Sequence, residues 1–103
     1  MSGARLERGE DGRLRLRGPL DFGTAAALWP EGLAAVAREG VTEIDLSAVE
    51  RTDSAGVALL LDWTRRAQGA GGRLRLHSVP EQLTAIIRAS GVEEVFEIAD
   101  EPG

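Results

Sequence analysis

The residues with the clearest potential for chemistry lie in the segment Thr52-Asp53-Ser54-Ala55-Gly56, near the middle of the sequence. A short alternating strand precedes this segment and an apolar periodic stretch follows it, which predicts a strand, a polar turn and the start of a helix. The Ser54 hydroxyl would then lie at a helix N-terminus, where backbone N–H groups favour negative charge. We therefore expect either a plain helix cap or a switch and docking point at Ser54. Thr52 and Asp53 are alternative caps.

The amino-acid inventory removes several classes of catalytic site. The 103 residues include no Cys and no Tyr, and all 12 basic residues are Arg, so thiolate chemistry, lysine Schiff bases and a P-loop lysine are excluded. The single histidine, His77, cannot form a two-histidine metal site, and the alternation around it predicts a solvent-facing side chain. We expect no enzyme activity, no metal and no cofactor.

Length and charge indicate a single soluble domain. We expect one domain over residues 1–103, with its core at about residues 4–97 and an acidic end at 97–103. A net charge of −5 opposes non-specific binding to nucleic acid or to an anionic bilayer. The sequence shows no signal-peptide pattern and no apolar stretch of membrane-spanning length, so we expect a cytoplasmic location without membrane insertion.

Three segments alternate strictly between apolar and charged residues, at 13–17, 43–46 and 73–77. This period of two predicts strands with one buried and one solvated face, and therefore a sheet that helices cover on one side only. Residues 4–8 and 13–17 predict an initial hairpin. If the acidic strand at 43–46 lies between the two basic strands, opposite charges are neighbours, each pair contributing about 0.2–1 kcal/mol.

Helical patterns separate the strands. The first covers about residues 24–38, with Thr24 as its cap and Pro30 inside it, which predicts a kink or a restart at the proline. The second covers about 55–68, and the third runs from Pro80 to Gly91. The predicted order is β-β-α-β-α-β-α, with a short last strand or turn around 95–96. In the second helix the face toward the sheet is predicted to hold Val57, Leu60, Leu61, Thr64 and Ala67.

Leu59 and Trp63 lie on a flank of the second helix, beside that predicted face. One interpretation is that another helix covers this flank. The other is an exposed apolar docking strip that runs from Ser54, with Trp63 as its anchor, because tryptophan is enriched at binding hot spots. Trp29 in the first helix carries the same ambiguity.

The element order, together with Gly18-Pro19-Leu20-Asp21, Ile44-Asp45-Leu46-Ser47 and the segment 52–56, resembles the STAS domain of anti-sigma factor antagonists and sulfate-transporter tails. The resemblance covers about residues 5–95. It implies an α/β (α+β mixed) fold with a four- to five-stranded mixed sheet and helices on one face. In the antagonists a partner kinase phosphorylates the serine that matches Ser54, and the acid that matches Asp21 lies near it at the partner surface.

Within the family, residues 27–29 and 56–63 are most similar to the MlaB group, the small STAS subunits of ABC complexes that move phospholipids between the two membranes of Gram-negative bacteria. This resemblance implies a non-catalytic subunit that binds the ATPase of such a complex, at the inner-membrane face through that partner. The alternative is an anti-sigma factor antagonist that phosphorylation of Ser54 releases from an anti-sigma kinase, and the Ser at this position, where the MlaB group often has Thr, keeps it open. For either partner we expect contacts at Asp21, Thr52, Asp53, Ser54, Ala55, Gly56, Leu59 and Trp63.

Overall fold

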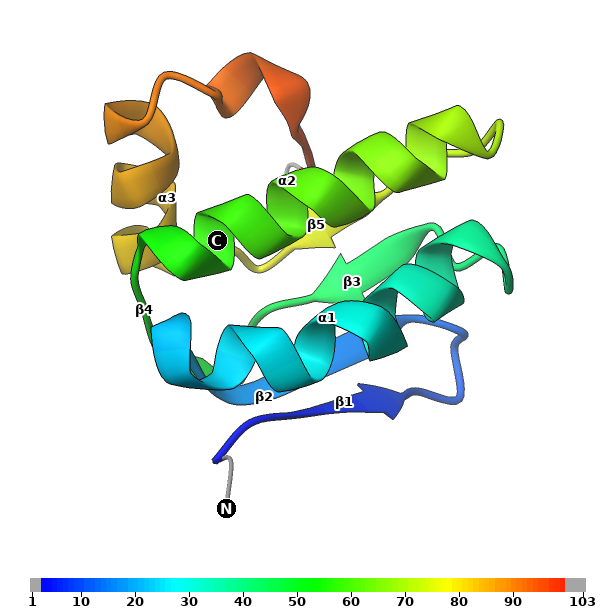
Figure 1. Cartoon of the computed structure of the whole chain (residues 1–103), viewed down its shortest axis with the longest axis horizontal. Coiled ribbons are helices and arrows are strands. Elements are labelled where there is room, and N and C mark those ends of the chain that lie inside the picture. The colour runs from blue at the N-terminus through cyan, green and yellow to red at the C-terminus, as the bar shows by residue number, and fades with distance from the viewer. Residues whose placement is uncertain (1–2, 100–103) are drawn as a thin grey trace.

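A mixed β-sheet with helices against one face forms the core of the fold (Figure 1). The computed structural model describes residues 3–99. Its strands are β1 (Arg5–Arg8), β2 (Leu14–Leu20), β3 (Glu43–Asp45), β4 (Val49–Thr52), β5 (Arg75–His77) and β6 (Glu97–Ile98). Its helices are α1 (Phe22–Ala37), α2 (Ser54–Gly69) and α3 (Glu81–Ala89), with a single 3-10 turn at Glu93–Val95.

Strand β2 organises the sheet because it pairs with three other strands. It is antiparallel to β1, parallel to β3 through Leu14 and Arg15, and parallel to β4 through Gly18 and Leu20. The order is β1-β2-β3-β5-β6, with β4 beside the far half of β2. The mixed sheet, the initial hairpin and the one-sided helical cover are as predicted. The described residues form six strands, more than the expected four to five, because the four-residue β4 shows no clear alternation; the short last strand expected around 95–96 lies at β6.

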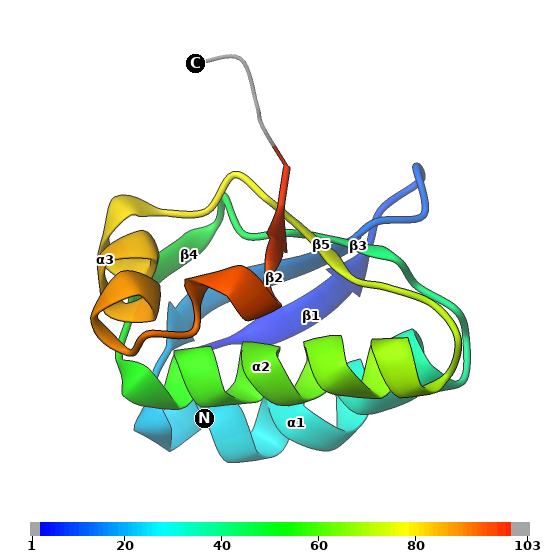
Figure 2. The ribbon, with the colours of Figure 1, turned by 90° about the horizontal axis from the view of Figure 1, so that it is seen from above.

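Helices α1 and α2 lie side by side beneath the sheet and run in the same direction, so that both begin at one end of the molecule (Figure 2). Helix α1 is a single helix through Pro30, and the predicted restart at that residue is wrong. Pro30 has no N–H to donate to the Ala26 carbonyl. Because Pro30 and Ala26 are both exposed, water can donate to that carbonyl instead. Thr24 is the third residue of the helix, since Asp21 supplies the cap instead.

The outer face of the sheet carries interleaved charges, as the sequence predicts. Acidic β3 lies between β2 and β5, and the Arg15 Nε atom lies 3.3 Å from Asp45 Oδ2. Burial raises the pKa of the Asp45 carboxyl, but hydrogen bonds from Ser47 and the Arg15 charge outweigh it and hold the pKa below its ordinary 3.8.

The prediction of a solvent-facing His77 is wrong, because the residue is only 5% exposed. His77 ends the interior strand β5, and its ring lies against Glu43 of the neighbouring strand β3. The Nε2 atom of His77 lies 2.7 Å from Glu43 Oε1, which gives the buried ring a polar partner.

A close contact between the two covering helices joins Trp63 of α2 to Gly32 of α1. A Cβ atom at Gly32 would overlap the indole ring of Trp63, so only glycine leaves room for this approach. The indole Nε1 donates a hydrogen bond of 3.0 Å to the Trp29 carbonyl, and Trp63 is completely buried. Between the helices and the sheet, the core is built from leucine, isoleucine and valine side chains, including Leu16, Leu20, Ile44, Leu46, Leu60, Leu74, Leu76, Leu83 and Ile87.

Candidate functional site

The candidate site is the end of the molecule where α1 and α2 both begin. Asp53 joins the two helix starts: its Oδ1 accepts a hydrogen bond of 2.9 Å from the Ala55 N–H, and its Oδ2 accepts one of 3.1 Å from the Phe22 N–H. Asp53 is therefore the N-cap of α2 and also satisfies the first N–H of α1. One carboxylate fixes the relative position of two helix N-termini.

Asp21 is the N-cap of α1. Its Oδ1 accepts from the Thr24 N–H at 3.1 Å, while the Thr24 hydroxyl accepts from the Asp21 N–H, which completes a capping box. Its Oδ2 lies 3.4 Å from the exposed Arg51 guanidinium. Asp21 is thus close to the predicted switch region, and its carboxylate is already engaged in structural contacts.

Ser54 is the first residue of α2 and is exposed. The expectation that it caps the helix is wrong by one residue, because Asp53 precedes it and takes that role. The hydroxyl lies at two aligned helix N-termini, whose partial positive charges favour an anion, but the Asp21 and Asp53 carboxylates already balance that charge. Ser54 is therefore exposed to solvent and does not cap the helix.

Thr52 and Gly56 lie beneath the surface, so they shape the site without presenting side chains to a partner. Thr52 is 6% exposed, and its N–H donates a hydrogen bond of 3.0 Å to Gln82 Oε1 at the start of α3. A Cβ atom at Gly56 would overlap the Thr52 hydroxyl and would lie only 3.0 Å from the Leu20 carbonyl oxygen. Their predicted role as partner contacts is corrected to one of positioning the helix start.

Leu59 and Trp63 do not form an exposed docking strip. Both are 0% exposed, since α1 packs along the flank of α2 and the Trp63 ring lies against Gly32. The interpretation that another helix covers this flank is correct for Trp63, and neither side chain is exposed to solvent. The apolar surface near Ser54 is therefore built from other residues.

That surface is a groove of about 440 Å³ between the first turns of α1 and α2. Phe22, at the first position of α1, is 85% exposed beside it, and Trp29 is half-buried with its Nε1 donating to Asp62 Oδ2 at 2.9 Å. Small side chains form the rest, so the groove has room for apolar groups of a partner. Its lining is Phe22, Ala25, Ala26, Trp29, Ser54, Ala55 and Ala58.

Sequence reasoning missed Phe22, although a usable signal was present. An apolar aromatic directly after a capping Asp occupies the first turn of a helix, where side chains often extend beyond the sheet edge. The sequence alone did not show that Asp21 was this cap, because Thr24 is also of a residue type that caps helices. Only the spatial pairing of the two helix starts brings Phe22 beside Ser54.

The groove beside Ser54 offers an apolar surface that is suited to binding. Within residues 3–99, no group of three or more His, Cys, Asp or Glu side chains is placed to hold a metal ion. The two carboxylates near Ser54 accept hydrogen bonds from backbone N–H groups, so both hold the helix starts in place. No helix in the described part of the chain is both long enough and apolar enough to cross a membrane.

Comparison with known proteins identifies the family. Residues 4–98 match the family described as "Mlab, STAS domain". The chain belongs to the STAS domain family. It is 36% identical over 75 residues to the intermembrane phospholipid transport system binding protein MlaB of Escherichia coli (strain K12), which is 73% of this chain and 75% of that protein. The MlaB protein of Shigella flexneri matches to the same extent.

Solved structures of this STAS fold include anti-sigma factor antagonists. The antagonist from Mycobacterium paratuberculosis superposes with a TM-score of 0.73 at 23% identity, over 95% of this chain and 85% of that one. A STAS domain protein from Planctomyces limnophilus gives a TM-score of 0.72 at 21% identity, over 96% and 91% of the two chains. At this level of identity the likeness establishes the STAS fold and leaves the pathway open.

Proposed function

We propose that this STAS protein is a non-catalytic subunit that binds the ATPase of an Mla-type phospholipid-transport ABC complex. The observation that carries the proposal is the 36% identity to MlaB, which includes three quarters of both chains. The family match over residues 4–98 supports treating the chain as a single STAS domain in this role. The ATPase partner would hold it at the cytoplasmic face of the inner membrane.

The docking surface in this proposal is the groove between the starts of α1 and α2. Phe22 is the anchor because it offers a large apolar side chain that is 85% exposed, and burying such a side chain contributes about 1.5–3 kcal/mol. Ser54 and Ala55 form the α2 wall of the groove, and Asp53 holds the two walls at a fixed spacing. Binding one state of the ATPase better than another would then favour that state.

A second function, anti-sigma factor antagonism, is supported by the state of Ser54. The hydroxyl is exposed at the first position of α2 and is not needed as a cap, so a kinase can reach it without unfolding the helix. A phosphate adds about −1.5 to −2 charge. It would lie beside Asp53 and in the wall of an apolar groove, where it would oppose insertion of a partner's apolar side chain.

The two functions separate in an affinity capture from native lysate with wild type and Ser54→Asp as bait. Recovery of an ABC ATPase with its permease supports the lipid-transport proposal. Recovery of an ATP-binding anti-sigma kinase by wild type, with loss from Ser54→Asp, refutes that proposal and favours the antagonist.

Matched variants show whether the groove is the docking surface. Ser90→Asp adds the same charge at an exposed position after α3, and we expect it to retain the partner. Phe22→Ser removes the anchor and should weaken capture without unfolding the chain, because the side chain is mostly solvent-exposed. Full partner binding by Phe22→Ser contradicts the proposed surface.

A further inference from the structure

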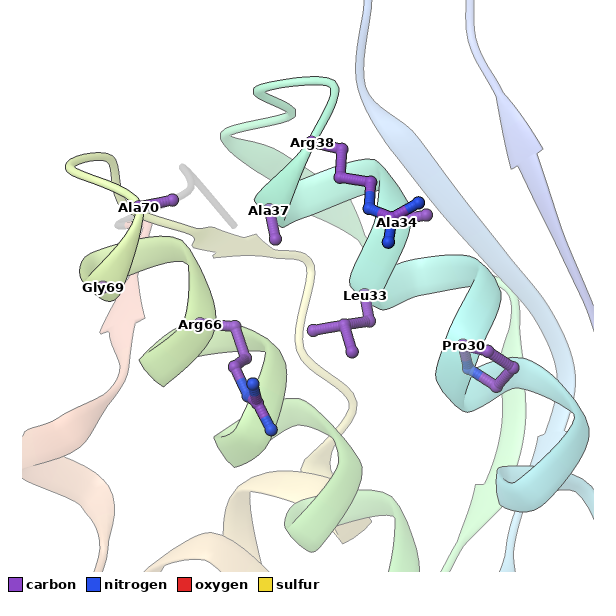
Figure 3. A pocket seen from close by; sticks show the side chains of 8 residues that line it. All are labelled: Pro30, Leu33, Ala34, Ala37, Arg38, Arg66, Gly69 and Ala70. Atoms are coloured by element: carbon purple, nitrogen blue, oxygen red, sulfur yellow. The ribbon is translucent and has the colours of Figure 1, made fainter.

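A second groove lies between α1 and α2 at the opposite end of the helix pair, where both helices finish (Figure 3). Its volume is about 660 Å³. Figure 3 shows Leu33 extending from α1 toward α2, with Arg66 opposite it on α2. The lining consists of Pro30, Leu33, Ala34, Ala37, Arg38, Arg66, Gly69 and Ala70.

The charge of this groove differs from that of the rest of the molecule. Two of its eight lining residues are arginine and none is acidic, in a chain whose net charge is −5. Among residues 3–99, the exposed Arg38 guanidinium has no carboxylate partner, whereas the adjacent Glu39 pairs with Arg8. In the described part of the chain, Arg66 pairs only with Asp62 one turn earlier, at 3.4 Å and at the surface, a contact that contributes little.

We propose that this groove, which we call the Arg38–Arg66 groove, binds a peptide segment of a partner protein that carries a carboxylate beside a large apolar side chain. The carboxylate meets one of the two guanidinium groups, whose planar donors suit carboxylate oxygens. The apolar side chain covers Leu33 and the alanines of the floor. This inference goes beyond the proposed function, because the groove lies at the far end of the helices from Ser54 and Phe22.

A peptide fits the groove better than a lipid does. The groove is open along the surface, and its apolar floor is one leucine with several alanines, which is too shallow to enclose an acyl chain. The last turns of both helices also present backbone carbonyl groups at this end, at Ala37 and Gly69. A peptide supplies N–H donors for such carbonyls together with its carboxylate.

The test is a selection of random displayed dodecapeptides on immobilised wild-type protein, with the double variant Arg38→Gln, Arg66→Gln as the counter-target. We expect the enriched peptides to combine Asp or Glu with Leu, Ile or Phe, and to bind the double variant at least about tenfold more weakly. Arg65→Gln is the matched control, since Arg65 is exposed on the same helix but does not line the groove, and it should bind as wild type does.

Three results would overturn the proposal. The first is enrichment of basic or purely apolar peptides, or equal binding to the double variant. The second is sedimentation of the protein with phosphatidylglycerol vesicles in a manner that depends on Arg38 and Arg66, which would assign the groove to a lipid headgroup. The third is concentration-dependent self-association that the double variant abolishes, which would assign it to a second copy of the chain. Circular dichroism of each variant confirms that the fold is retained.

Discussion

Replacing Gly32 with alanine tests the packing of α1 against α2 directly. In an exposed helix interior, Gly→Ala stabilises a protein by about 1 kcal/mol, because alanine loses less backbone entropy on folding. At Gly32 the added Cβ would overlap Cζ2, Cη2 and Cε2 of the Trp63 ring, far inside the ~3.5–4.0 Å of a normal carbon contact. The substitution should therefore destabilise the protein despite its favourable helix propensity.

The magnitude follows from two costs and one gain. Forcing an extra carbon into a packed core costs about 1–3 kcal/mol. Moving the Trp63 ring also lengthens its hydrogen bond to the Trp29 carbonyl, now 3.0 Å, which is worth about 1 kcal/mol. The helix-propensity gain of about 1 kcal/mol offsets part of this. We expect Gly32→Ala to lower the free energy of unfolding by about 1–3 kcal/mol.

Urea unfolding followed by circular dichroism measures this loss, and the melting temperature should fall by about 4–8 °C for each kcal/mol. Gly69→Ala is the matched control, because Gly69 also lies in a helix but a Cβ there meets nothing within 4 Å. It should leave stability unchanged or raise it by up to about 1 kcal/mol. If Gly32→Ala is as stable as Gly69→Ala, the close approach of the two helices is not real.

The remaining predictions concern the site and the sheet. Asp53→Ala should lower the free energy of unfolding by about 1–2 kcal/mol through loss of the α2 cap, whereas Ser54→Ala should change it by less than about 0.5 kcal/mol, both measured in urea. Phe22→Ser should stay within about 0.5 kcal/mol of wild type in the same assay while losing affinity for the partner in the capture experiment. Asp45→Asn should be less stable than wild type above pH 3.8. The difference in free energy of unfolding should vanish as the pH falls through the lowered pKa of Asp45 in the folded state, because protonated Asp45 loses the same contacts. A difference that persists in acid contradicts the role given to the Asp45 charge.

Much of the fold could be predicted from the sequence because the charged alternation on the strands is strong. The position of acidic β3 between two basic strands follows from it, and Arg15 and Asp45 are neighbours as expected. Strand β4 gave no such signal, since only Val49 and Thr52 of its four residues are buried. Its place beside β2 depends on a long-range pairing that local sequence does not encode.

The sequence pointed to the Ser54 segment as the candidate site, and several of the side chains it named there are buried in the structure. Helical periodicity identifies one buried face of α2, yet two neighbours, the sheet and α1, cover this helix, so the buried face is wider than one stripe. Trp63 is hidden because α1 offers a glycine opposite it, a match between residues 31 positions apart that no local pattern reveals. The exposed apolar side chain beside Ser54 is instead Phe22, which reaches the site through Asp53.

The two tryptophans make the paired helices a built-in optical reporter. The chain has no tyrosine, so Trp29 and Trp63 produce essentially all of its near-ultraviolet emission. Trp63 is buried between the two helices, so its emission responds to their separation. Trp29 is half-buried in the lining of the groove beside Ser54, and its indole N–H donates a hydrogen bond to Asp62. The fluorescence of single-tryptophan variants would therefore distinguish occupation of the groove, reported by Trp29, from separation of the two helices, reported by Trp63.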